Sequence, residues 1–158
     1  MLLLVLVSAS AVLLVQVHRD QDLVVKRYFS VLSDSNGLFL NLVDAETAVR
    51  GYILSGNDAD LRPLRALQSP DFKARGDALK RNLGTNGQLV TALNQTSRSI
   101  GEWYTGFVQP SLDKVRTSGP RSVTEADLAR GRASFDVVRS DYAAYRTAVL
   151  QRRTAVSN

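Results

Sequence analysis

Apolar and small residues recur at alternating steps of four and three positions along the first third of the chain. The positions are Val24, Tyr28, Val31, Ser35, Leu38, Leu42, Ala45, Val49 and Tyr52. This spacing places one narrow stripe along a helix, which buries it against partner helices. The stripe continues in phase back to Leu3, so it predicts one continuous helix. That helix should end at Ser55-Gly56-Asn57-Asp58, where a glycine C-cap precedes a new N-cap.

Three further helical segments follow, and no stretch alternates as a β-strand does. We expect helices over about residues 19–55, 59–83, 87–117 and 123–156. Ser69-Pro70 indicates a restart within the second, Pro110 should kink the third, and Ser122 to Glu125 fits a capping box at the start of the fourth. The pattern therefore predicts an all-α protein, an antiparallel up-down four-helix bundle with both chain ends at the same end.

The first helix is also predicted to extend into an N-terminal membrane anchor. Residues 1–17 carry no charge, and a helix of that length reaches about 26 Å, close to the roughly 30 Å of a bilayer core. The alternative is a cleaved signal peptide, because the small residues Ser8 to Ala11 resemble a cleavage region. Against this, no basic residue precedes Leu2, and leucine and valine resume after the small residues. We favour a transmembrane anchor over residues 1–18 that contacts membrane lipid, with an extracytoplasmic domain over residues 19–157.

Composition excludes most catalytic chemistry. The 158 residues contain no cysteine and one histidine, His18, so a thiolate metal site, a zinc site with two imidazoles and a histidine-based triad have no ligands or partners. The net charge of +5 is spread over lysines and arginines in runs no longer than two, which is not the clustered pattern of a nucleic-acid interface. We therefore expect no enzyme activity, no catalytic residues, no metal or cofactor, and no nucleic-acid partner.

The densest polar cluster spans Asp44 to Tyr52. Asp44 falls on the outer face of the first helix, whereas Glu46 lies beside the buried stripe and needs a partner. Arg50 follows four residues later in the favourable order for an ion pair. Two interpretations stay open, a structural clamp in the membrane-distal part of the bundle and a polar pocket in which Arg50 holds an anionic or polar ligand.

Two pairs of aromatic residues could line a pocket. They are Trp103 with Tyr104, and Tyr142 with Tyr145. Aromatic residues on a helical stripe more often belong to the core. We retain Trp103 and Tyr104 as candidate pocket residues, with membership of the core as the alternative.

The stretch from Leu42 to Gly56, LVDAETAVRGYILSG, resembles the signature of the third, all-helical class of CHASE sensory domains, which typically reads D-A-E-T-G-x-R-G-Y-x-L-T-G. The matching residues are Asp44, Ala45, Glu46, Thr47, Arg50, Gly51, Tyr52, Leu54 and Gly56. Ala48 replaces the usual glycine, and Ser55 replaces the usual threonine but keeps its hydroxyl. Weaker similarity covers roughly residues 20–156. The resemblance singles out Asp44, Glu46, Thr47, Arg50, Gly51 and Tyr52 as a possible ligand site or structural clamp.

The resemblance implies an extracytoplasmic sensory input domain of a bacterial transmembrane receptor, foremost a two-component sensor histidine kinase. Such a domain sits on the periplasmic or extracellular side of the inner membrane and passes a stimulus inward by relative motion of its first and fourth helices. We expect a parallel homodimer, a small-molecule or protein stimulus, and a second span with an output domain beyond Asn158. The alternative is an anchored or secreted structural helical bundle without signalling output.

Overall fold

The computed structural model describes the backbone of residues 2–157 and the side chains of residues 26–156. Its elements are α1 (Leu2–Ser55), η1 (Asp58–Leu61), α2 (Arg62–Ala66), α3 (Pro70–Leu83), α4 (Gly87–Trp103), η2 (Tyr104–Val108), α5 (Gln109–Ser118) and α6 (Glu125–Ser157). Of these, η1 is a 3₁₀-helix and η2 a π-helix. Residues 2–157 contain no β-strand, and the prediction of an all-helical fold is confirmed.

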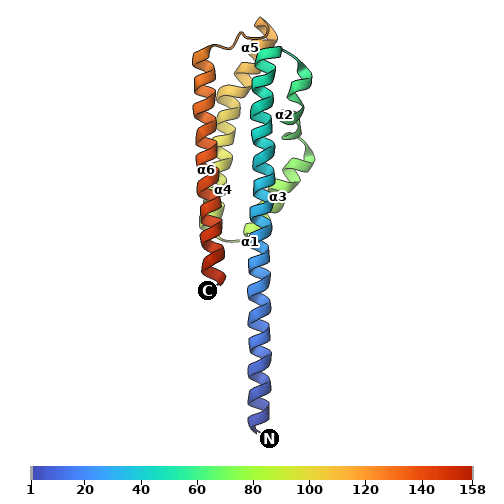
Figure 1. The fold of residues 1–158 in the computed structure, drawn as a ribbon, viewed down its shortest axis with the longest axis vertical. Helices are drawn as coiled ribbons and strands as arrows, with labels where there is room; N and C mark the ends of the chain where they lie inside the picture. The colour runs from blue at the N-terminus through green and yellow to red at the C-terminus, as the bar shows by residue number, and fades with distance from the viewer. Residues whose placement is uncertain (1, 158) are drawn as a thin grey trace.

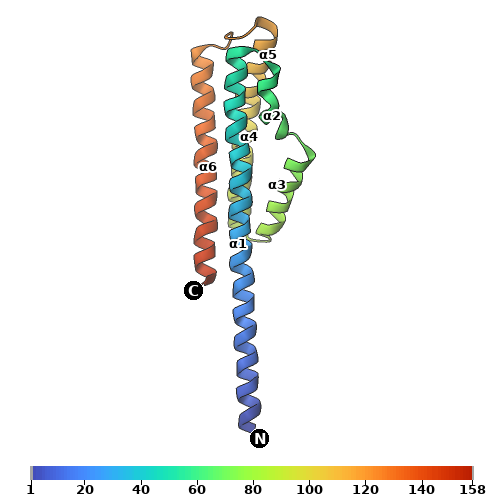
Figure 2. The same cartoon turned by 45° about the vertical axis from the view of Figure 1, so that its right-hand side comes forward.

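The helices lie side by side and alternate in direction (Figures 1 and 2). Helix α1 runs from its N-terminal end to the opposite end of the molecule, which we call the distal end. Helices α2 and α3 return from there, α4 to α5 run toward the distal end again, and α6 comes back alongside α1. Helix α4 packs along α6, while α1 contacts α2, α3 and α6. Helix α6 therefore ends beside the middle part of α1 (Figure 1).

The anchor predicted over residues 1–18 lies outside the residues whose side chains are described. Within residues 26–156, no helical stretch combines the length and the hydropathy of a membrane span.

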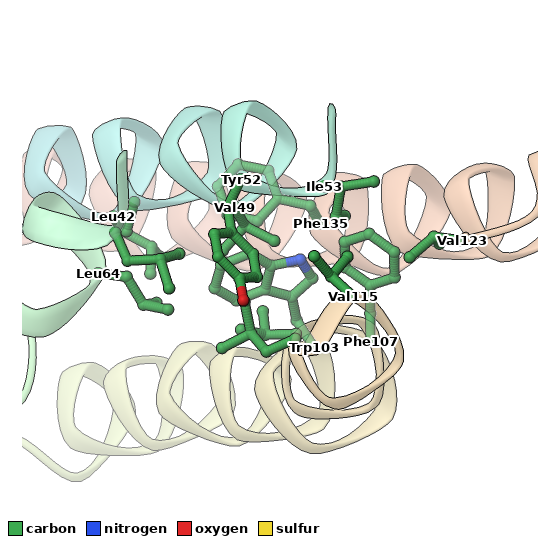
Figure 3. Packing of buried hydrophobic residues seen from close by; sticks show 14 of the residues in the cluster. Leu42, Val49, Tyr52, Ile53, Leu64, Trp103, Phe107, Val115, Val123 and Phe135 are labelled. Carbon is green, nitrogen blue, oxygen red and sulfur yellow. The ribbon is translucent and has the colours of Figure 1, made fainter. Parts of the chain in front are cut away.

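Two clusters of buried side chains form the core. The distal cluster surrounds Trp103 and includes Tyr52, Phe107 and Phe135, as Figure 3 shows. The Trp103 and Phe135 rings lie 5.0 Å apart between centroids. The second cluster lies toward the opposite end and includes Tyr28 of α1 and both tyrosines of α6, Tyr142 and Tyr145.

The predicted stripe of α1 provides one wall of both clusters. Its buried members are Tyr28, Val31, Ser35, Leu42, Ala45, Val49 and Tyr52. Leu38 is half-buried. The seam read from the sequence is thus the face that α1 turns to its neighbours.

The segment predicted as one helix over residues 59–83 is divided into three pieces, η1, α2 and α3. The break before α3 follows the sequence signal, because the Ser69 side chain accepts a hydrogen bond from the backbone N–H of Phe72 and Pro70 occupies the first turn. Pro63 likewise lies in the first turn of α2, which begins at Arg62 without a side-chain cap. The sequence placed the restart correctly but missed the separate 3₁₀ turn, which Asn57 caps by accepting from the Ala59 N–H.

The capping box predicted from Ser122 to Glu125 was wrong by two residues. The N-cap hydrogen bonds of α6 come from Thr124, whose hydroxyl oxygen accepts from the Asp127 N–H while the Asp127 carboxylate accepts from the Thr124 N–H. The Ser122 hydroxyl donates instead to the carbonyl of Lys114, across the loop between α5 and α6. The helix thus begins at the second reciprocal pair in the sequence, Thr124 with Asp127.

The interruption predicted at Pro110 takes the form of the π-helical turn η2. Proline has no N–H to give to the carbonyl one turn earlier, and its ring crowds that carbonyl. A π turn widens the helix just before the proline, and such turns often mark functional sites. Here the turn buries Phe107 and Val108 and leaves Tyr104 half-buried.

Candidate functional site

A cavity of about 490 Å³ lies between the two core clusters. Its walls come from α1, α2, α3, α4, η2 and α6. The α1 wall consists of Ser35, Leu38, Phe39 and Leu42, and the α3 wall includes Phe72 and Gly76. Most of the remaining lining residues are leucine, isoleucine or aromatic residues. Its volume lies within the range of small-molecule sites, roughly 300–1,000 Å³.

The cavity exists because α3 does not pack closely on α4. The break at Ser69 turns α3 away from α4, and Figure 2 shows α3 diverging from the other helices. Two glycines add space, since nothing lies within 4 Å of the position that a Cβ would take at Gly76 or Gly101. The break in the second helical segment and the lack of side chains at Gly76 and Gly101 thus leave a cavity beside α1.

Tyr142 and Tyr145 are the two residues that α6 contributes to the lining. Tyr142 stacks on Phe39 of α1 with ring centroids 4.0 Å apart and an interplanar angle of 6°. Tyr145 is 0% exposed. Neither hydroxyl has a hydrogen-bond partner among the described residues. A buried polar atom without a partner costs about 1–3 kcal/mol.

Burial raises the pKa of the Tyr145 phenol above its ordinary value. The nearby Ser35 hydroxyl lowers the pKa and so offsets part of this rise, while Tyr142 adds to it. Tyr145 is therefore a neutral phenol at physiological pH.

The candidate pocket residues Trp103 and Tyr104 both line the cavity. The Tyr104 hydroxyl accepts a hydrogen bond from Gln68 Nε2 at 2.9 Å, which links η2 to the loop after α2. The Trp103 indole nitrogen also has no partner among the described residues. In Figure 3 it lies toward Val115 and Phe135, on the side away from Leu42. Trp103 therefore presents an apolar edge to the cavity.

The Glu46–Arg50 ion pair expected from the sequence is present, with 2.6 Å between Arg50 Nε and Glu46 Oε1. The Glu46 side chain is 8% exposed and that of Arg50 45%. Asp44 and Thr47 lie on the exposed face, where the Thr47 hydroxyl donates to the carbonyl of Val43. The pair holds a nearly buried carboxylate and leaves its cation half in solvent.

The end of the motif fastens α1 to the distal loops. The Gly56 N–H donates to the carbonyl of Tyr52, and Gly56 adopts a φ of 68°, which favours glycine. The Ser55 hydroxyl donates to the Asp60 carboxylate in η1. The Arg121 N–H, from the loop before α6, donates to the carbonyl of Ile53 at 2.7 Å. Two of these bonds satisfy carbonyls in the last turn of α1, and together the three bonds join α1, η1 and the loop before α6.

Gly51 and Tyr52 belong to the same junction. Tyr52 is buried in the distal cluster, and a Cβ at Gly51 would lie 3.7 Å from the Asp60 carboxylate. None of Asp44, Glu46, Thr47, Arg50, Gly51 and Tyr52 lines the cavity. The motif thus lies on α1 between the cavity and the distal end, where its last residues bond to η1 and to the loop before α6.

The sequence did not single out the α3 wall of the cavity, Phe72 and Gly76. Nothing in the spacing of α3 distinguishes a residue that faces a hollow from one that faces a packed core. Tyr142 and Tyr145 were recognised as a pair that could line a site, and they do line the cavity while also belonging to a core cluster.

The chain thus forms an all-helical domain with an ion-paired motif at its distal end and an apolar cavity between its helices. The family model of the CHASE3 domain matches residues 23–157, and the chain belongs to that family, as its resemblance indicated. CHASE3 domains are extracellular sensory domains of signalling receptors. No curated protein and no solved structure matches the chain.

Proposed function

We propose that this domain is the extracytoplasmic input module of a bacterial transmembrane receptor, foremost a two-component sensor histidine kinase. Residues 1–18 would anchor it in the inner membrane and residues 19–157 would lie on the periplasmic side. The module would be non-enzymatic and would act on an output domain elsewhere in the receptor. Membership of an extracellular sensory family supports this role.

The observation that carries the proposal is that one cavity is lined by both α1 and α6, the two helices that run toward the proximal end, opposite the distal end. Helix α1 supplies Ser35, Leu38, Phe39 and Leu42, and α6 supplies Tyr142 and Tyr145. A ligand that prefers one relative position of α1 and α6 shifts the population toward that position by its difference in affinity. In a receptor, sliding or rotation of the two helices would carry the shift across the membrane.

We also propose that two copies pair in parallel through the outer face of α1. Phe29, Leu40 and Leu54 are 67%, 55% and 59% exposed. Their spacings of 11 and 14 residues are close to whole numbers of helical turns, so they share one face. This row of exposed apolar side chains is the observation that supports pairing through α1.

The test is a full-length receptor in which this domain precedes a second span and a kinase with a transcriptional reporter. Arg50→Ala and the cavity-filling Gly76→Leu should change basal reporter output, because one loosens the distal junction and the other occupies the hollow between α1 and α3. Asp44→Ala is the matched control, since its exposed side chain lies in the same motif, and its output should match the wild type.

Membrane insertion and cellular level are measured for each variant by immunoblot of the membrane fraction. Wild-type output from both Arg50→Ala and Gly76→Leu, at normal membrane levels, would refute the sensory role and favour a structural bundle.

A further inference from the structure

The aliphatic hydroxyls that line the cavity are engaged within their own helices. Those of Ser35, Thr96, Ser97 and Thr105 donate to carbonyls three or four residues earlier in the chain. Each of these hydroxyls has its proton in a hydrogen bond inside the protein. None of them therefore offers a free proton to a ligand in the cavity.

Three other polar atoms belong to lining residues but do not open onto the cavity. The hydroxyl oxygens of Tyr142 and Tyr145 and the indole nitrogen of Trp103 are fully buried. A cavity that admits a water molecule gives accessible surface to any atom that faces it, and these three atoms have essentially none. The three residues thus line the cavity with ring carbons, while their polar atoms lie in the packed core.

The longest polar side chains of the lining are exposed to solvent. The Gln68 amide donates to the Tyr104 hydroxyl at 2.9 Å, and Lys80, the one charged residue of the lining, is exposed. Most of the walls consist of leucine, isoleucine and aromatic residues. A charged or hydrogen-bonding group carried into the interior would lose its hydration and find no matching partner there.

The size of the cavity sets the second condition on a ligand. Cavities lined by leucine, isoleucine and phenylalanine stay dry, because water finds no hydrogen-bond partners in them, and one of about 150 Å³ takes up benzene or xenon. The cavity described here, at about 490 Å³, has room for a molecule well beyond the size of benzene. Burial of apolar surface would provide the affinity.

We propose that this cavity binds a compact, wholly apolar small molecule, held by contact with carbon atoms and without hydrogen bonds or ion pairs. Such a molecule would touch Phe39 of α1, Phe72 of α3 and the Tyr142 ring of α6, all of which line the cavity. The Tyr142 ring already stacks on Phe39, so the ligand would lie against the contact between α1 and α6. This inference rests on the proposed sensory function and names the chemical class of its stimulus.

Three brominated probes of nearly the same shape test the ligand class on the full chain in detergent micelles. They are 1-bromoadamantane, which is apolar, 3-bromo-1-adamantanol, which adds a hydroxyl, and 3-bromoadamantane-1-carboxylate, which is charged at pH 7. Bromine quenches tryptophan fluorescence at short range, and Trp103, the single tryptophan, lines the cavity. Protein-free micelles at the same detergent concentration give the free concentration of each probe.

The apolar probe should quench Trp103 saturably. The alcohol should bind at least about fivefold more weakly, because its hydroxyl is buried without a partner, and the carboxylate should bind more weakly still. An interior that supplied a hydrogen bond or a counter-charge would reverse this order.

Two variants fill the cavity from different walls. Gly76→Leu acts from α3 and Gly101→Leu from α4, and a Cβ at either position meets nothing within 4 Å. Gly87→Leu is the matched control, because Gly87 is an equally open helical glycine that does not line the cavity. Both filling variants should abolish quenching at probe concentrations that saturate the wild type, and Gly87→Leu should bind like the wild type. Circular dichroism checks that each variant keeps its fold.

Quenching by the apolar probe that persists in both filling variants would overturn the proposal. So would an alcohol or carboxylate that binds as tightly as the apolar probe, or an apolar probe that gives no saturable quenching. These binding assays use no output domain, so a negative result removes the ligand class without bearing on signalling. The reporter assay with Arg50→Ala fails or succeeds separately and decides the sensory role.

Discussion

The contact between Gly131 of α6 and Phe107 of η2 leads to a sharp prediction about stability. A Cβ at Gly131 would lie 2.4 Å from Phe107 Cε2 and 2.5 Å from two neighbouring ring atoms. Non-bonded carbon atoms prefer separations of about 3.5–4.0 Å. Replacing Gly131 by alanine must therefore move the ring or the two helices by about 1 Å.

Two opposing terms set the expected magnitude. Overpacking a core costs about 1–3 kcal/mol, while alanine in a helix interior is favoured over glycine by about 0.8–1.0 kcal/mol. Gly101→Ala is the matched control, because its Cβ would meet nothing within 4 Å. We expect Gly101→Ala to stabilise the protein by up to about 1 kcal/mol and Gly131→Ala to be less stable than that control by about 1–3 kcal/mol.

The assay is urea unfolding of the full chain in mild detergent, followed by Trp103 fluorescence. Trp103 is 1% exposed and packs on Phe135, one helical turn from Gly131. A third variant, Phe107→Leu combined with Gly131→Ala, should recover part of the loss, because the shorter side chain leaves room for the methyl group. If Gly131→Ala proves as stable as Gly101→Ala, or if Phe107→Leu gives no recovery, the contact does not limit packing here.

Three further predictions use the same unfolding measurement. Arg50→Ala leaves a nearly buried carboxylate without its cation and should cost about 1–3 kcal/mol, whereas Arg116→Ala, which breaks an exposed i,i+3 pair, should cost less than about 0.5 kcal/mol; equal losses would contradict the clamp. Because burial raises the pKa of Tyr145, the folded state holds its proton longer than the unfolded state, so stability should fall as pH rises above about 10. Tyr145→Phe should flatten that fall and be neutral or stabilising at pH 7, and an unchanged pH profile would argue against the buried phenol. Thr124→Ala removes the observed cap of α6 and should cost about 1 kcal/mol, more than Ser122→Ala; the reverse order would restore the cap position expected from sequence.

The long helices could be predicted because their seams are periodic and local. The stripe of α1 identified its buried face from Tyr28 to Tyr52, and the Glu46–Arg50 spacing identified the ion pair. Ser69-Pro70 marked the start of α3 for an equally local reason. Features that depend on a few neighbouring residues were therefore accessible.

Features that depend on contacts between distant segments were not. Two reciprocal caps compete before α6, and the choice of Thr124 follows from the loop, where Ser122 is held by Lys114 and Arg121 by Ile53. Pro110 predicted an interruption of the helix, but the sequence does not distinguish a π turn from a kink. The cavity results from the course of α3 relative to α4. The periodic pattern of apolar residues within a helix does not reveal how two helices diverge.

The break between α2 and α3 makes one wall of the cavity exchangeable. Phe72 and Gly76 face the hollow from a helix of 14 residues that belongs to neither the α4–α6 seam nor the distal junction. Substitutions at these two positions can reshape the cavity while the helices that lead to the proximal end keep their packing. Under the proposed sensory function, a change of stimulus would require substitutions in one short helix only, and the packing of α1 against α6 would stay the same.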